Sequence, residues 1–178
     1  MAILPRFPEK IDVFQPKQPQ LMFRGKIPIQ ELLEYIRALL VKRGFEVSMS
    51  KYKIKGSSGK LGEMEVKIEG ERKELEFIKY KITIEIRVES GKVLEMESEN
   101  MYKTVDSQIE IKISGEMELD YDKKYDPKNK IKDFLGRVYW LYMKKSILFR
   151  ADSYWYECLG ILNELKKKLN IKLTKTAY

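Results

Sequence analysis

The stretch Ile78-Lys79-Tyr80-Lys81-Ile82-Thr83-Ile84-Glu85-Ile86-Arg87-Val88 alternates strictly between apolar and polar side chains. A period of two predicts a β-strand that is buried on one face and wet on the other. The same alternation returns over residues 109–120. Both runs lie within residues 73–121, so we expect an antiparallel sheet at the centre of the fold.

Working outward, the alternation predicts five strands in a meander, joined by short turns rich in Gly and Ser. Their expected ranges are residues 45–54, 61–69, 73–89, 93–103 and 105–121, with turns at Gly56–Gly59, Gly70-Glu71 and Ser90-Gly91 and a bulge near Ser50-Lys51. The last strand would be about 56 Å long if straight. A globule of this length is only about 40 Å across, so the strand must curve strongly, break or project from the body, and of these we expect curving.

Helical periodicity flanks the sheet on both sides. Residues 28–43 carry an apolar stripe between Pro28 and Gly44, residues that suit the start and the end of a helix. After the sheet we expect two helices, 131–150 and 153–169, with Asp152 as the N-cap of the second. The run 131–150 is apolar on nearly all sides, but it is too short and too charged for a membrane span.

The expected architecture is α+β with two layers: a curved antiparallel five-stranded sheet packed on one N-terminal and two C-terminal helices. Residues 1–27 are expected to form an extended Pro-rich arm that docks on its own domain or on a neighbour. Within the arm, residues 21–27 are expected to form a short strand. Residues 28–170 form a single α+β domain, and 171–178 a short tail.

Two resemblances accompany this pattern. The order of helix, meander and C-terminal helix resembles helix-grip proteins of the START and polyketide-cyclase type, which implies a hydrophobic cavity under the sheet. Gly44-Phe45-Glu46-Val47 after an amphipathic helix, with Tyr80-Lys81-Ile82-Thr83-Ile84-Glu85-Ile86, resembles small uncharacterised archaeal α+β proteins. That second resemblance covers residues 28–150 and implies no activity.

Composition excludes several classes of protein. The 178 residues include one cysteine and no histidine, which rules out a disulfide framework and histidine-based catalysis. The N-terminus lacks the features of a secretory signal, so we expect a cytoplasmic protein. Abundant Lys, Glu and Ile are typical of a thermophile or of an AT-rich genome.

The net charge of +8 is unevenly distributed along the chain. Residues 1–60 carry +7, residues 61–121 carry −7 and residues 122–178 carry +8. One interpretation is a set of solvated Lys and Glu faces. The other is an acidic side and a basic side, which would steer an anionic partner or stack on a second copy.

Candidate sites for chemistry are weak. Cys158 lies on an apolar helical stripe and is expected to be inert. The loop Gly56–Gly62 has strands on both sides, unlike a phosphate cradle. The cluster Asp120, Asp122 and Asp126 lacks the pattern of a calcium loop and has lysines around it. We therefore expect no enzyme activity, no cofactor and no metal.

The sequence favours a non-enzymatic interaction or assembly subunit. Its expected partner is either a second copy, bound through the arm and the aromatic helices, or another protein. The expected interface residues are Phe7, Phe14, Phe23, Tyr139, Trp140, Tyr142, Tyr154 and Trp155. Two alternatives stay open. The first is a carrier of a small apolar ligand, with a cavity lined by Met64, Ile84, Ile111 and Leu135. The second is nucleic-acid binding through Arg137, Lys144, Lys145, Arg150, Lys166 and Lys167.

Overall fold

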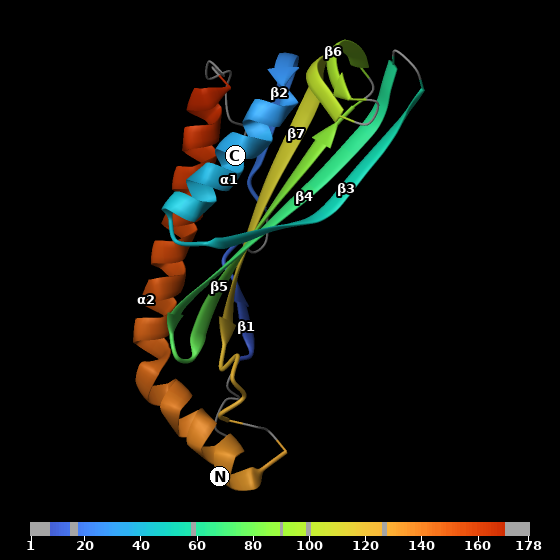
Figure 1. Ribbon diagram of the computed structural model, residues 1–178. Coiled ribbons are helices and arrows are strands. Elements are labelled where there is room, and N and C mark those ends of the chain that lie inside the picture. Colours follow the sequence, from blue (N-terminus) through green and yellow to red (C-terminus); the bar gives the residue numbers. More distant parts are fainter. Residues whose placement is uncertain are drawn as a thin grey trace.

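The computed structural model describes residues 8–14, 18–57, 60–89, 91–98, 101–125 and 128–169. In these ranges the elements are β1 (Lys10–Asp12), β2 (Gln20–Pro28), α1 (Ile29–Lys42), β3 (Glu46–Ser57), β4 (Lys60–Leu75), β5 (Ile78–Val88), β6 (Gly91–Ser98), β7 (Met101–Leu119) and α2 (Lys130–Lys168). All strands belong to one antiparallel sheet, and the helices lie on one side of it (Figure 1). The predicted α+β class is confirmed.

β7 is the strand around which the sheet is built. One of its edges pairs with β1 and β2, and the other pairs with β5 and β6. β4 and β3 then extend the sheet beyond β5. The predicted strand at 21–27 is confirmed by β2, which pairs with β7 of its own chain. Figure 1 shows that the sheet is strongly twisted along the length of β7.

Not all of the turns expected at glycine residues are present. β3 and β4 are antiparallel and Ser57 pairs with Lys60, as the expected turn at 56–59 requires, although residues 58 and 59 lie outside the described residues. The expected turn at Ser90-Gly91 is wrong, although Ser90 itself lies outside the described residues. β5 and β6 both run antiparallel to β7, with Val88 opposite Ile109 and Lys92 opposite Asp106, so the direction does not reverse there.

Gly70 lies in the middle of β4 and is not part of a turn. It pairs with Ile82 on β5. A Cβ at this position would lie 2.9 Å from Cγ2 of Ile82 and 3.3 Å from Cβ of Phe45. The glycine is therefore needed because neighbouring side chains pack directly over the strand.

The β-bulge predicted near Ser50-Lys51 is present, as a register shift between Met49 and Lys51. A second shift falls between Lys73 and Leu75, where the apolar phase of the sequence changes. Both irregularities add to the twist of the sheet.

α1 closely matches the predicted helix. It ends at Lys42, with Arg43 as C-cap, and Gly44 follows with φ of 80°, a conformation that favours glycine. Its predicted stripe packs on the sheet through buried Ile29, Leu32, Ile36, Leu39 and Leu40.

The two predicted C-terminal helices are in fact one. α2 runs without a break for 39 residues, a length of about 58 Å. Asp152 is a helical residue and not an N-cap, and its neighbour Ala151 packs into the core at 7% exposure. The N-cap of α2 is Asn129, whose side chain accepts hydrogen bonds from the amides of Ile131 (3.0 Å) and Lys132 (3.4 Å).

α1 and the C-terminal half of α2 lie side by side on the sheet (Figure 1). An ion pair between Arg43 and Glu164 (2.7 Å) joins them. The core lies between this pair of helices and the inward residues of the sheet, among them Ile82, Ile84 and Ile113, which are fully buried. The first turns of α2 continue past the ends of the strands (Figure 1).

Candidate functional site

α2 has two apolar faces, and only one of them is used within the chain. Its buried residues, such as Trp140, Ala151 and Cys158, face the sheet. Residues two positions apart are about 200° apart around a helix. Val138 and Phe149, each two residues before a buried one, therefore point away from the sheet and are exposed.

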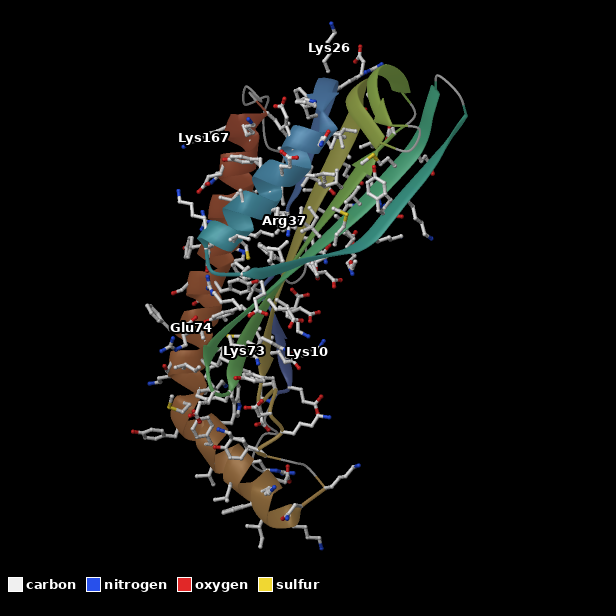
Figure 2. The ribbon with its side chains drawn as sticks, viewed as in Figure 1. Lys10, Lys26, Arg37, Lys73, Glu74 and Lys167 are labelled. Atoms are coloured by element: carbon white, nitrogen blue, oxygen red, sulfur yellow. The ribbon has the colours of Figure 1, made fainter. Side chains whose placement is uncertain are left out.

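We call this second face the α2 stripe. Its residues are exposed by between 42% (Leu148) and 86% (Tyr142). The stripe consists of Ile131, Phe134, Leu135, Val138, Leu141, Tyr142, Leu148 and Phe149. Their spacing of three, four and seven places them on one side of the helix. Figure 2 shows side chains of α2 on the side that faces away from the sheet as well as on the side that faces it.

The stripe is large for a monomer. If a fully exposed side chain of this size presents about 170 Å², the eight residues together expose roughly 800 Å². The largest apolar patch on a typical monomer is about 300–600 Å². A standard protein interface takes about 800 Å² from each partner. The stripe is thus large enough to be one half of an interface.

The borders of the stripe are basic. Lys130, Lys132 and Lys144 are exposed beside it, and Lys145 is exposed within it. Between residues 130 and 150 the sequence has one acidic residue, Asp133, which pairs with Arg137 at 2.7 Å. Any occupant of this surface must tolerate or neutralise these lysines.

Aromatic contacts away from the stripe fix the N-terminal turns of α2 to the rest of the fold. The ring of Tyr139 stacks on Tyr125 with centroids 5.4 Å apart, and it meets Phe77 edge-on at 5.3 Å. Gly136 allows Tyr125 to approach the helix, since a Cβ there would lie 2.9 Å from the Cβ of Tyr125. These contacts orient the stripe outward.

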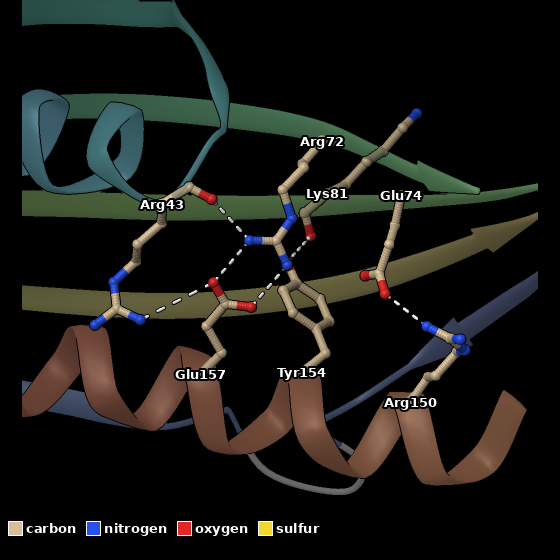
Figure 3. A network of polar contacts seen from close by, with 7 residues as sticks. All are labelled: Arg43, Arg72, Glu74, Lys81, Arg150, Tyr154 and Glu157. Carbon is tan, nitrogen blue, oxygen red and sulfur yellow. Dashed lines mark hydrogen bonds and ion pairs between the residues drawn. The ribbon is translucent and has the colours of Figure 1, made fainter. Parts of the chain in front are cut away.

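A polar network fixes the middle of α2 to the sheet (Figure 3). Arg72 on β4 donates two hydrogen bonds of 2.8 Å to Glu157 and one of 2.8 Å to the carbonyl of Arg43. Its guanidinium also lies 4.5 Å from the ring centre of Phe45. The Tyr154 hydroxyl donates to the carbonyl of Lys81 at 2.9 Å.

The pKa values of several titratable groups around this network are shifted in directions that suit a structural role and not a catalytic one. Hydrogen bonding to Glu157 raises the pKa of Arg72. Burial raises the pKa of Tyr80 to about 12, that of the Cys158 thiol to about 12, and that of Tyr154 as well. At neutral pH the phenols and the thiol are therefore protonated, and Cys158 is a poor nucleophile.

A pocket of about 280 Å³ opens beside this network. Its charged lining consists of Arg72, Glu74, Arg150 and Glu157. Arg150 pairs with Glu74 at 2.6 Å, and Arg72 pairs with Glu157. Both arginine side chains that line the pocket are therefore already paired with a carboxylate. We assign the pocket a structural role.

The described outer face of the sheet carries both signs of charge, which fits the interpretation of solvated Lys and Glu faces and not that of one acidic side. Lys79 and Lys81 lie 3.1 and 3.0 Å from Glu118. Lys51 of β3 pairs with Glu65 at 2.6 Å, because the basic N-terminal segment contributes strands to the acidic sheet. These cross-strand pairs neutralise the central strands.

The structure separates the predicted interface residues. Phe14, Trp140 and Tyr154 are buried in the chain's own core and cannot form an intermolecular surface. Phe23 and Trp155 are partly buried against that core, and Tyr139 stacks on Tyr125. Phe7 lies outside the described residues. Tyr142 is the predicted residue that belongs to the stripe.

The predicted anion contacts do not form a cluster. Arg137 and Arg150 are engaged by Asp133 and Glu74. Lys144 and Lys145 border and enter the stripe, whereas Lys166 and Lys167 lie in the last turn of α2, roughly 30 Å along the helix from Lys145.

The predicted ligand cavity is not assembled from its four residues. Met64, Ile84 and Ile111 are buried in the core, but Leu135 is 52% exposed on the stripe. The carboxylate cluster is not assembled as a site either. Asp120 accepts hydrogen bonds from the amides of Lys124 (2.7 Å) and Tyr125 (2.8 Å), and Asp126 lies outside the described residues. Among the side chains that the structure describes, no group could hold a metal ion.

Sequence reasoning missed seven of the eight stripe residues. The available signal was the seven-residue spacing of Ile131 and Val138, and of Phe134, Leu141 and Leu148. It was masked because the sheet-facing residues of the same helix are also apolar, which removes the contrast on which helical periodicity depends.

The chain matches no family model, no curated protein and no solved structure. Within the described ranges, neither α1 nor α2 combines the length and the apolar character needed to cross a membrane.

Proposed function

We propose that this protein is a non-enzymatic interaction subunit that self-associates through the α2 stripe. The exposed apolar area of the stripe supports the proposal, because leaving roughly 800 Å² of apolar surface in water is costly. The outward orientation of the stripe adds to this support. The helix is capped at Asn129 and packed at Tyr139, so the stripe is a rigid surface that needs little ordering when it binds.

The arm has a smaller part in this proposal than the sequence predicted. β1 and β2 already complete the sheet of their own chain. The surface offered to a second copy is then the stripe.

A pair of matched variants tests the proposal. Val138→Glu places a charge in the centre of the stripe, and Val41→Glu places the same charge on α1, where the side chain is 56% exposed. Light scattering after size-exclusion chromatography should give the mass of a dimer for the unmodified chain and for Val41→Glu. Val138→Glu should be a monomer at the same concentration, with an unchanged circular dichroism spectrum.

A monomeric unmodified chain would refute self-association. In that case the basic border of the stripe points to an anionic partner, the second candidate. Binding to single-stranded DNA that weakens steeply with salt would then support nucleic-acid recognition.

A further inference from the structure

The residues of the α2 stripe have the spacing of a two-helix seam. Ile131, Val138 and Lys145 recur every seven residues, and so do Phe134, Leu141 and Leu148. The two series alternate along the helix at intervals of three and four residues. This spacing is typical of helices that pack their side chains between those of a second helix. The occupant that fits this seam best is therefore a helix with a matching seam.

We propose that α2 pairs with α2 of a second copy in antiparallel orientation, an inference that rests on the self-association proposed above. In antiparallel seams, residues of one series face residues of the other series. Aligning the two stripes over their full length puts Ile131 opposite Leu148 and Val138 opposite Leu141. The two-fold axis repeats each contact, so the surface is complementary to itself.

Lys145 decides the orientation. It is exposed at the C-terminal end of its series, whose other two members, Ile131 and Val138, are apolar. A parallel pair in register would place the two Lys145 ammonium groups against each other in the seam, where repulsion and loss of hydration are costly. The antiparallel pair instead puts each Lys145 opposite Phe134 of the other copy, where a cation can lie over an aromatic ring. A single polar residue in such a series specifies the register of the two helices at a cost in stability.

The rest of the molecule is compatible with this arrangement. The buried face of α2 is opposite to the stripe, so the two sheets lie on the outer sides of the helix pair. The first turns of α2 also extend beyond the strands (Figure 1), and the residues of the seam are exposed.

Disulfide cross-linking of the full chain tests the orientation. Val138→Cys and Leu141→Cys are prepared as separate proteins, one with a mass tag, and oxidised alone and as an equal mixture. A disulfide needs Cα atoms about 5.5 Å apart. The antiparallel seam brings residue 138 to residue 141, so the mixture should give the mixed dimer at least about five-fold more than either protein gives alone. The native Cys158 is fully buried and does not compete.

Val41→Cys on α1 is the matched control, and it should not cross-link to either variant. Efficient cross-linking of Val138→Cys with itself would show a parallel pair and overturn the orientation while leaving self-association intact. A dimer by mass in which no combination cross-links would place the interface elsewhere. A monomer by mass would overturn both proposals, and binding of that monomer to anionic lipid vesicles would identify a membrane surface as the occupant.

Discussion

Arg72 connects three elements of this fold. It joins β4, the end of α1 and the middle of α2 through contacts with the Arg43 carbonyl and Glu157, and it lies over the rings of Phe45 and Tyr80. Both side chains of the Arg72–Glu157 pair are only about one-fifth exposed, at 22% and 21%. Removing one partner leaves the other charge poorly hydrated.

We expect Arg72→Met to lower the free energy of unfolding by about 2 kcal/mol, because Glu157 loses its two charged hydrogen bonds. The control is Lys10→Met, which breaks the exposed pair with Glu116, where the side chains are 57% and 45% exposed. Its effect should stay below about 0.5 kcal/mol. Urea unfolding measures the free energy of both variants. Equal losses would show that the Arg72–Glu157 pair stabilises the protein no more than an exposed ion pair does.

At the scale of elements, the contact between β7 and α2 depends on a missing side chain. A Cβ on Gly115 would lie 2.8 Å from Cγ2 of Val13, 3.1 Å from Sγ of Cys158 and 3.2 Å from Tyr154. The strand and the helix can approach to this distance because residue 115 is glycine.

Gly115→Ala should destabilise the protein by about 1–3 kcal/mol through overpacking. The matched control is Gly160→Ala in α2, where the nearest atom to a new Cβ is a nitrogen of Arg43 at 3.6 Å. That change should stabilise the helix by about 0.5–1 kcal/mol. Thermal unfolding would show a lower midpoint for the first variant and a higher one for the second. Two changes of the same sign would contradict the packing argument.

At the scale of the whole molecule, charge and apolar area act against each other in self-association. The stripe favours pairing, but Lys130, Lys132 and Lys144 on its borders meet a second set of the same charge. The net charge of +8 adds a general repulsion between copies.

Raising NaCl from about 50 mM to about 500 mM should therefore tighten the dimer by a few fold, because salt screens the lysines. Sedimentation equilibrium at both concentrations measures this change. The opposite trend, dissociation at high salt, would indicate an interface made from opposite charges and would contradict the stripe as the site.

The sequence by itself determined the antiparallel sheet, α1 and the bulge at Met49–Lys51, because alternation and capping are local properties of the chain. It did not determine the role of Gly70 or the continuity of α2 through Asp152. The first depends on Ile82 and Phe45 above the strand, and the second on the packing of Ala151 against the sheet.

The candidate site belongs to this second group. The sequence indicated that residues 131–150 are apolar on nearly all sides, and it predicted Tyr142, which the structure leaves exposed, as an interface residue. Which of two opposite apolar faces remains in water was decided only when the sheet covered the face of Trp140 and Ala151. A helix can pack only one of its faces on a single sheet. The stripe is therefore exposed because of how α2 docks on the sheet, and not because of the local sequence of the helix.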